Sequence, residues 1–228
     1  MTLKAYTISG FVRKIRNPDP GIAEKAGPDL NKSYLVFKRC FDWTFSILLM
    51  LGMLAWLLPL MALLIKLDSR GPVFFLQRRV GKGGRLFTCY KLRTMVVNPQ
   101  ADECPATEDD IRITRLGRLL RKSHLDELPQ LFNVFLGSMS LVGPRPYMPA
   151  DCQKFAVILP GHEYRNFVKP GITGLAQIKG LHGSKTDFKT IFWRYQWDTF
   201  YVRNAGFLLD LRILRRTALS FFTQSKPL

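Results

Sequence analysis

The chain has 228 residues, long enough for one domain with a hydrophobic core and an appended segment. Its 34 Lys+Arg against 17 Asp+Glu give a formal net charge of +17, which favours an anionic partner such as nucleic acid, anionic lipid or a phosphorylated substrate. Four cysteines show no C-x-x-C spacing and no histidine at a zinc-like distance, so they indicate a reducing compartment and no structural metal.

Two segments near the N-terminus differ sharply in composition. Residues 1–33 are punctuated by Pro and Gly and predict an irregular arm. Residues 43–65, WTFSILLMLGMLAWLLPLMALLI, contain no charge. As a helix at about 1.5 Å per residue, this run can cross a bilayer core of about 30 Å, which a soluble core helix rarely needs. The mixed charges before it and the lack of a small-residue cleavage site argue against a signal peptide. We therefore predict a membrane helix.

The flanks of this helix are basic on both sides. Lys38 and Arg39 precede it, and Lys66, Arg70 and further basic residues follow. Positive residues usually mark cytoplasmic flanks, so we expect both ends on the cytoplasmic side and a re-entrant helix broken at Pro59. A tilted helix that spans the membrane is the alternative.

Residues 72–95, PVFFLQRRVGKGGRLFTCYKLRTM, predict two strands around a Gly-rich turn. The GKGG within them lacks the GxxxxGK[ST] spacing of a phosphate loop, which favours a hairpin turn. Residues 98–110 are polar and acidic and predict a mobile loop. A helix follows with a basic stripe suited to phosphates, formed by residues that recur every three positions: Arg112, Arg115, Arg118 and Arg121.

An acidic pair, Asp126 and Glu127, lies within HLDELPQLFNVF (124–135). Ser123 could cap a helix start here, or the helix could begin near Leu128, because proline is tolerated best in a first turn. In both cases the two carboxylates lie at a helix N-terminus, a place that suits acidic side chains and phosphate binding.

The C-terminal part combines aromatic and basic residues. Seven aromatics occur in a short stretch, Phe188, Phe192, Trp193, Tyr195, Trp197, Phe200 and Tyr201. Trp and Tyr favour the lipid headgroup zone, but packing in the core is an equally open interpretation. Residues 206–222 predict a basic amphipathic helix that can lie in the membrane interface.

Several motifs in order resemble the bacterial sugar transferase family, the monotopic phosphoglycosyl transferases that begin lipid-linked glycan assembly. They are FKRCFD (37–42), GPVFFLQRRVG (71–81), YKLRTM (90–95), the stretch 112–146 ending in GPRP, and VKPGITGLAQIKG (168–180). The resemblance covers about residues 36–223. It implies an α+β fold: a re-entrant membrane helix (34–68) and a compact, mainly helical cytoplasmic domain (69–228) with a small β-hairpin and interfacial amphipathic helices. Leu58-Pro59 stands where members often carry Ser-Pro.

The resemblance also implies a reaction and its residues. Members move a sugar 1-phosphate from a UDP-sugar to undecaprenyl phosphate and release UMP, at the cytoplasmic face of the bacterial inner membrane, to start exopolysaccharide or other lipid-linked glycans. By resemblance, Asp126 is the covalent nucleophile and Glu127 its partner, with Mg²⁺ bound by both. The residues implied to bind the phosphates of the substrates are Lys91, Arg93, Arg121 and Arg145, the last framed by Pro144 and Pro146.

The tail looks more like that of hexose-1-phosphate transferases than of enzymes that use diacetamido sugars, which favours UDP-glucose or UDP-galactose. Membrane lipids are expected partners, nucleic acid is not, and a homodimer is left open. A nucleic-acid-binding protein would explain the charge but not the apolar run. A catalytically silent membrane scaffold of a glycan assembly complex would explain both, but not an acidic pair followed by a Pro-Arg-Pro loop.

Overall fold

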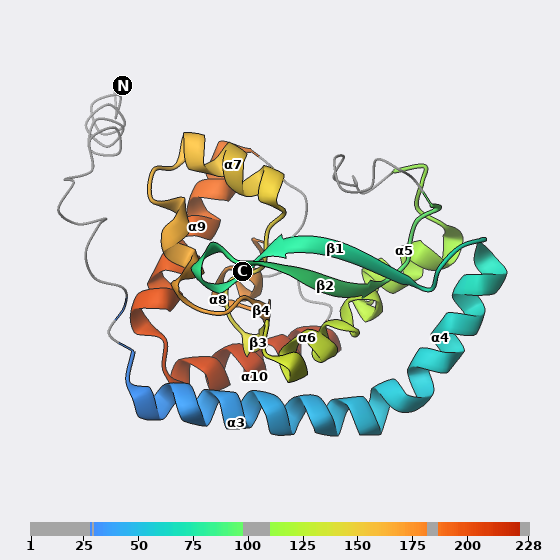
Figure 1. Cartoon of the computed structure of the whole chain (residues 1–228), viewed down its shortest axis with the longest axis horizontal. Helices are drawn as coiled ribbons and strands as arrows, with labels where there is room; N and C mark the ends of the chain where they lie inside the picture. The colour runs from blue at the N-terminus through green and yellow to red at the C-terminus, as the bar shows by residue number, and fades with distance from the viewer. Residues whose placement is uncertain (1–27, 29, 98–109, 182–186, 224–228) are drawn as a thin grey trace.

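A computed structural model of the chain describes residues 28, 30–97, 110–181 and 187–223. Residues 98–109 of the predicted loop 98–110 and most of the predicted arm 1–33 therefore lie outside the described residues. The described part is mainly helical with two small sheets, as expected for the predicted α+β class (Figure 1).

The apolar run belongs to one continuous helix of 37 residues, Lys32–Asp68. It consists of α3 (Lys32–Leu49), a π-helical turn (Met50–Leu54) and α4 (Ala55–Asp68). The Asn31 side chain accepts a hydrogen bond from the Ser33 amide at 2.8 Å, so the helix begins two residues before the predicted boundary at residue 34. Only 11% of its most apolar 18-residue stretch is buried, and its length and composition suit a membrane segment rather than a soluble core.

The helix changes direction between α3 and α4, as Figure 1 shows. Pro59 lies inside α4 and does not break it, so the predicted position of the break is wrong by several residues. A proline removes the hydrogen bond to the carbonyl four residues earlier and its ring crowds that carbonyl, here that of Ala55. The π-helical turn that ends directly before Ala55 accommodates the bend, as π-turns commonly do.

The predicted hairpin is confirmed. Strands β1 (Phe74–Val80) and β2 (Leu86–Leu92) pair antiparallel around a 3₁₀ turn, Lys82–Gly84. Gly83 adopts a φ of 65° there, which suits glycine. A second sheet pairs β3 (Ser140–Val142) with β4 (Gly171–Thr173) in parallel. The sequence did not predict it, because each strand has three residues and β3 is buried on both faces.

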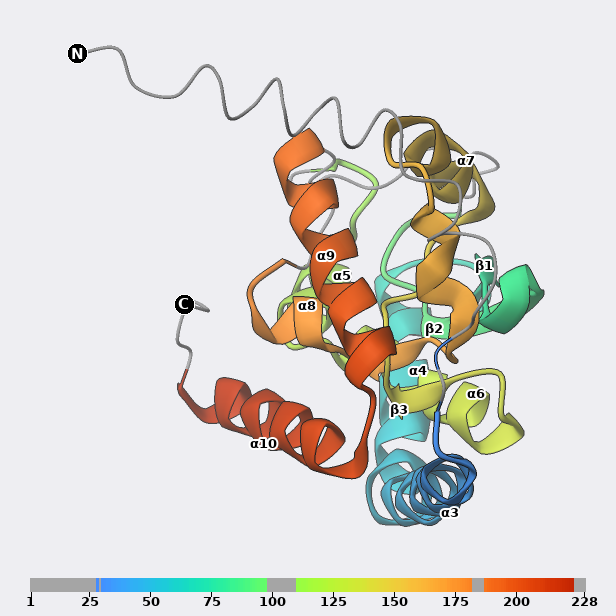
Figure 2. The same cartoon turned by 90° about the vertical axis from the view of Figure 1, so that its left-hand side faces the viewer.

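In the part of the chain that the structure describes, these sheets are accompanied by the helices α5 (Arg115–Lys122), α6 (Gln130–Leu136), α7 (Pro149–Ile158), α8 (Leu175–Ile178), α9 (Phe188–Asn204) and α10 (Phe207–Thr223). Two 3₁₀ segments, Leu125–Glu127 and His162–Phe167, connect them. Figures 1 and 2 place α3 and α10 on one side of the molecule and α7 on the opposite side.

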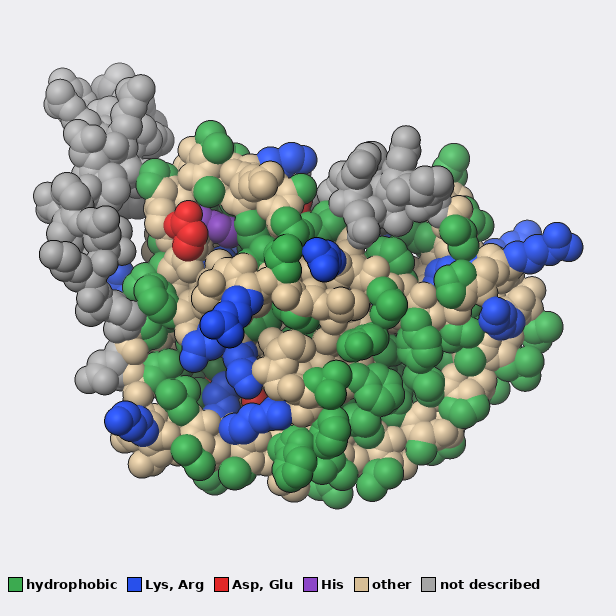
Figure 3. Space-filling model, in the orientation of Figure 1, with side chains coloured by type: hydrophobic (Ala, Val, Ile, Leu, Met, Phe, Trp, Pro, Cys, Tyr) green, Lys and Arg blue, Asp and Glu red, His purple; other side chains and the backbone are tan. Residues whose placement is uncertain are grey.

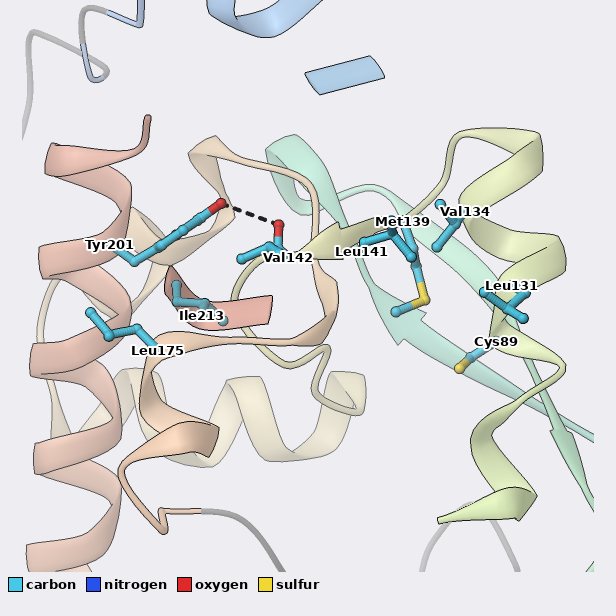
Figure 4. Close-up of a cluster of buried hydrophobic side chains, with 9 residues drawn as sticks. All are labelled: Cys89, Leu131, Val134, Met139, Leu141, Val142, Leu175, Tyr201 and Ile213. Atoms are coloured by element: carbon cyan, nitrogen blue, oxygen red, sulfur yellow. Dashed lines mark hydrogen bonds between the residues drawn. The ribbon is translucent and has the colours of Figure 1, made fainter. Parts of the chain in front are cut away.

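The main core lies where β2, β3 and α6 meet the C-terminal helices (Figure 4). Its buried members are Cys89, Leu131, Val134, Met139, Leu141, Val142, Leu175, Tyr201 and Ile213. The Tyr201 hydroxyl lies 3.2 Å from the Val142 carbonyl oxygen. Tyr201 thus belongs to the core, whereas Phe188, Trp193 and Phe200 are exposed. Each of the two open interpretations of the aromatic stretch therefore has residues that suit it, and contact of the exposed rings with lipid stays a prediction.

The long apolar helix is tied to the domain through Asp210 of α10. Its carboxylate accepts hydrogen bonds from Lys38 at 2.6 Å, Tyr34 at 2.9 Å and Tyr201 at 2.7 Å. These partners come from α3 and α9, so one buried acid holds α3, α9 and α10 together.

Candidate active site

Helix α5 precedes the acidic pair in the chain and packs against Thr94, just after the C-terminal end of β2. Its N-cap Thr114 accepts a hydrogen bond from the Gly117 amide at 2.9 Å. A Cβ on Gly117 would lie 2.0 Å from the Thr94 carbonyl oxygen, so only glycine permits this close approach. Arg121 reinforces the contact by donating its Nε to the Thr94 hydroxyl at 2.9 Å.

A tight reversal then presents the two carboxylates. His124 adopts the left-handed φ of 56°, and Leu125–Glu127 form the 3₁₀ turn before α6, whose N-cap is Pro129. Of the two helix starts left open, the Ser123 N-cap is wrong, because the Ser123 hydroxyl donates to the Leu119 carbonyl at 2.9 Å, at the C-terminal end of α5. The start near Leu128 is the better one, since α6 begins at Gln130. The acids consequently precede α6 and do not lie in its first turn, because the chain must first reverse after α5.

Glu127 is held by two cations. Lys91 of β2 lies 2.7 Å from its Oε1, and Arg145 donates to both oxygens, at 2.6 Å to Oε1 and 3.1 Å to Oε2. Burial alone would raise the pKa of Glu127, but the charges of Arg145 and Lys91 outweigh it and hold that pKa well below its usual value. Glu127 is therefore an anion whose oxygens are already engaged.

Asp126 has a different environment although it is the next residue in the chain. The residue is 8% exposed and, within the described residues, its carboxylate accepts no hydrogen bond. Burial raises its pKa and the charge of Glu127 raises it further, while the charges of Lys91, Arg121 and Arg145 lower it. Asp126 is thus a carboxylate near three cations with its oxygens uncommitted, and the two acids differ in the way that distinguishes catalytic roles.

The Pro144–Pro146 loop is fixed through its carbonyl groups. The Pro144 oxygen accepts from the Gly171 amide at 3.0 Å, the Arg145 oxygen from Arg165 at 2.6 Å, and the Pro146 oxygen from Arg79 at 3.1 Å. Both prolines are buried and lack an amide hydrogen. The loop therefore aims the Arg145 side chain at Glu127 from a rigid base.

Two residues that the sequence did not single out support this loop. Arg165 forms an ion pair with Asp198 of α9 at 2.8 Å, and the two side chains are 3% and 4% exposed. The Arg165 guanidinium also lies over the Tyr147 ring, 3.9 Å from its centroid. The sequence did contain a signal for this pair, the acidic Asp198 within the aromatic stretch of α9. Packing of that helix buries the acid, and a buried acid needs a cation as its partner.

The structure brings Lys91, Asp126, Glu127 and Arg145 together, with Arg121 at their edge, but not Arg93. The Arg93 guanidinium is buried and donates to the Ser69 carbonyl at 2.7 Å and to the Arg70 carbonyl, so it closes the C-terminal end of α4. Its direct contact with a substrate phosphate, implied by the resemblance, has no geometric support.

The predicted basic stripe is incomplete. Arg112 precedes α5 and pairs with Asp110 at 2.5 Å, and Arg121 turns inward to Thr94. Arg115 and Arg118 remain exposed on α5. The stripe failed because the helix begins only at Arg115.

Comparison with known proteins identifies relatives over most of the chain. The family model for bacterial sugar transferase matches residues 33–224. A protein of Xanthomonas campestris pv. campestris named UDP-glucose:undecaprenyl-phosphate glucose-1-phosphate transferase is 40% identical over 202 residues, which are 88% of this chain and 42% of that protein. One from Aeromonas hydrophila, named for UDP-N-acetylgalactosamine, is 43% identical over 169 residues, 72% of this chain and 40% of that protein.

A relative of similar size occurs in Rhizobium leguminosarum bv. phaseoli. This exopolysaccharide production protein PSS is 42% identical over 201 residues, 84% of this chain and 98% of that protein. The chain therefore spans less than half of the Xanthomonas and Aeromonas relatives but nearly all of the Rhizobium one. Because the family model covers most of the chain, and the acidic pair and the Pro-Arg-Pro loop meet in one site, this chain belongs to the bacterial sugar transferase family.

Proposed function

We propose that this chain transfers a sugar 1-phosphate from a UDP-sugar to undecaprenyl phosphate and releases UMP. The observation that carries the proposal is Asp126, a buried carboxylate without a hydrogen bond beside Lys91, Arg121 and Arg145. Glu127 accompanies it with its oxygens already bound by cations. The names of the Xanthomonas and Rhizobium relatives support the same reaction and a role in exopolysaccharide production.

In the proposed first step, an Asp126 carboxylate oxygen attacks the phosphorus that bears the sugar. The bond from that phosphorus to the bridging oxygen breaks, and the electron pair leaves with UMP, which gives an acyl phosphate on Asp126. An anionic nucleophile and an anionic diphosphate repel each other, so nearby cations are needed. Lys91 and Arg145 supply positive charge beside the phosphoryl oxygens. In the second step, the phosphate oxygen of undecaprenyl phosphate attacks the same phosphorus and the Asp126 carboxylate is released.

The residues present fit Mg²⁺ through Asp126 more readily than through Glu127. No group of three or more His, Cys, Asp or Glu side chains able to hold a metal occurs among the described residues. Mg²⁺ commonly needs only one or two carboxylates when substrate phosphates complete its shell. Asp126 has open oxygens, whereas cations already lie 2.6 and 2.7 Å from Glu127 Oε1. A bound Mg²⁺ would neutralise phosphate charge.

The donor sugar is proposed to be a hexose, glucose or galactose, as the C-terminal sequence favours. Identity alone does not separate the alternatives, since relatives named for glucose and for N-acetylgalactosamine are 40% and 43% identical. UMP release from a panel of UDP-sugars with undecaprenyl phosphate would identify the donor.

The bent helix α3–α4 is proposed to enter the inner membrane and return, with the domain 69–228 on the cytoplasmic face. Basic residues on both flanks and the bend before Pro59 support this topology. Single-cysteine variants near Thr7 and at Lys82 should resist labelling from outside intact cells. Labelling near Thr7 alone would instead establish a spanning helix.

The nucleophile is tested without a lipid acceptor. Enzyme, UDP-glucose or UDP-galactose and Mg²⁺, quenched rapidly, should yield sugar phosphate on the peptide that contains Asp126, with one equivalent of UMP. Asp126→Asn should give neither product while it keeps its fold and membrane association. Absence of the adduct together with initial rates that require a ternary complex would assign direct attack by the lipid instead.

A further inference from the structure

A second group of cations lies apart from Glu127, beside Gly137 at the end of α6. Lys169 Nζ and Arg39 Nη2 lie 3.5 and 3.1 Å from the position that a Cβ on Gly137 would occupy. Arg39 also donates to the Val134 and Phe135 carbonyl oxygens, both at 2.7 Å, and so closes the C-terminal end of α6. Three segments far apart in the chain thus meet here, α3, α6 and the residues before β4.

The charge at this place is unbalanced. Within the described residues Lys169 forms no ion pair. Burial lowers the pKa of its amine, and the charges of Arg39 and Lys82 lower it further. Asp42 opposes them, but its buried carboxylate already accepts the Leu141 amide at 2.9 Å. Repulsion between a half-buried lysine and two further cations raises the free energy of the unbound protein. Binding of an anion would relieve this repulsion.

The neighbours of Arg39 on α3 indicate the kind of anion that would bind here. Arg39 follows Val36 by three residues and precedes Trp43 by four, so the three share one face of α3. Val36 and Trp43 are exposed, and the Trp43 ring stacks on Phe135 with centroids 5.7 Å apart. Tryptophan favours the headgroup zone of a membrane. Figure 3 shows a group of Lys and Arg side chains above the first part of α3, with an acidic side chain among them and hydrophobic surface beside it.

We propose that Lys169, Arg39 and Lys82 bind the phosphate group of an anionic membrane phospholipid. The ammonium of Lys169 would meet the phosphate beside Gly137, where Lys169 and the Arg39 guanidinium come together, while the acyl chains follow the apolar face of α3. None of the three cations contacts Asp126 or Glu127. The site goes beyond the proposed transferase activity and its test needs no UDP-sugar.

The full chain in a neutral detergent is titrated with phosphatidylglycerol or phosphatidylcholine, and bound lipid is counted by native mass spectrometry. Phosphatidylglycerol should bind in preference. Lys169→Gln should weaken its binding about fivefold, the usual effect of one basic residue at a lipid surface. The matched control is Lys154→Gln, which removes the same charge from an exposed position of α7, on the opposite side of the molecule.

Two further measurements separate this site from general attraction and from a folding role. Without lipid, Lys169→Gln should raise Tm, because it removes an unpaired cation. Lys82→Gln, at an exposed turn, should also weaken phosphatidylglycerol binding about fivefold without a risk to folding. Equal losses in Lys154→Gln, no loss in either site variant, or displacement of the lipid by equimolar inorganic phosphate, UDP or undecaprenyl phosphate would overturn the proposal.

Discussion

Two carboxylates of this molecule bind arginine in contrasting ways. Asp198 and Arg165 form a pair that is 4% and 3% exposed, with one acid for one cation. Glu127 binds two cations, Lys91 and Arg145, and the Arg145 side chain is 34% exposed. Arg165 also donates to the Arg145 carbonyl oxygen, and its guanidinium lies over the Tyr147 ring. Beside Glu127, in contrast, Asp126 accepts no hydrogen bond within the described residues.

The difference indicates that the Asp198 pair has a structural role and that the Glu127 group can take part in the reaction. A dry, balanced pair has no capacity left for a ligand, and breaking it leaves a buried charge. A partly open group with excess positive charge can accept another anion. The two groups are connected, because Arg165 holds the backbone of the residue whose side chain holds Glu127. We therefore infer that the Asp198 pair maintains the geometry of the Glu127 group.

The largest effect should follow from breaking the balanced pair. Asp198→Ala leaves Arg165 buried without its acid and should destabilise the fold by about 3–5 kcal/mol. Thermal unfolding in detergent measures the change in Tm. Glu163→Gln, which alters an exposed acid two residues from Arg165, should change stability by no more than about 0.5 kcal/mol. Equal stability of Asp198→Ala and wild type would contradict the structural role of the pair.

Substitution of Arg145 in the open group should change activity more than stability. Arg145→Lys keeps the charge but loses the planar fork that engages both oxygens of Glu127. We expect the rate of UMP release to fall about 100-fold, as when one preorganised donor is removed from a phosphoryl or acyl transfer site. Arg118→Lys on the exposed face of α5 is the control and should retain full activity. Near-normal turnover with a lower Tm would instead make Arg145 a loop-stabilising residue.

The sequence predicted those parts whose causes are local. Strand propensity and a Gly-rich turn specified the β1–β2 hairpin, and apolar length specified the helix. The direction of a guanidinium is not local: Arg93 and Arg145 both lie in motifs, yet Arg93 turns to the end of α4 and Arg145 to Glu127. Tertiary packing decides this, as it does for the Asp198 pair. The bend lies at Met50–Leu54 because Pro59 acts on the turn before it.

The smallest expected effect is on the free energy of unfolding, where the two adjacent acids should contribute with opposite sign. Burial raises the folded-state pKa of Asp126 above its ordinary 3.8, so its charge disfavours the fold at neutral pH. Asp126→Asn should therefore stabilise the protein at pH 7, by about 0.5–2 kcal/mol, as substitutions that relieve a strained active site commonly do. Glu127→Gln should destabilise it, because the pKa of Glu127 is held below its ordinary 4.5 by Arg145 and Lys91.

The pH dependence follows from the same two directions. As pH falls from the raised folded-state pKa of Asp126 toward 3.8, the carboxyl protonates and the advantage of Asp126→Asn should disappear. The stability that Glu127 contributes is present above pH 4.5 and is lost as pH falls through its lowered folded-state pKa, so the deficit of Glu127→Gln should also shrink in acid. Tm measured for both variants and wild type between pH 7.5 and the acid limit of solubility checks this. If both substitutions shift Tm in the same direction at pH 7, the two acids share one environment, and the assignment of Asp126 as the uncommitted carboxylate is wrong.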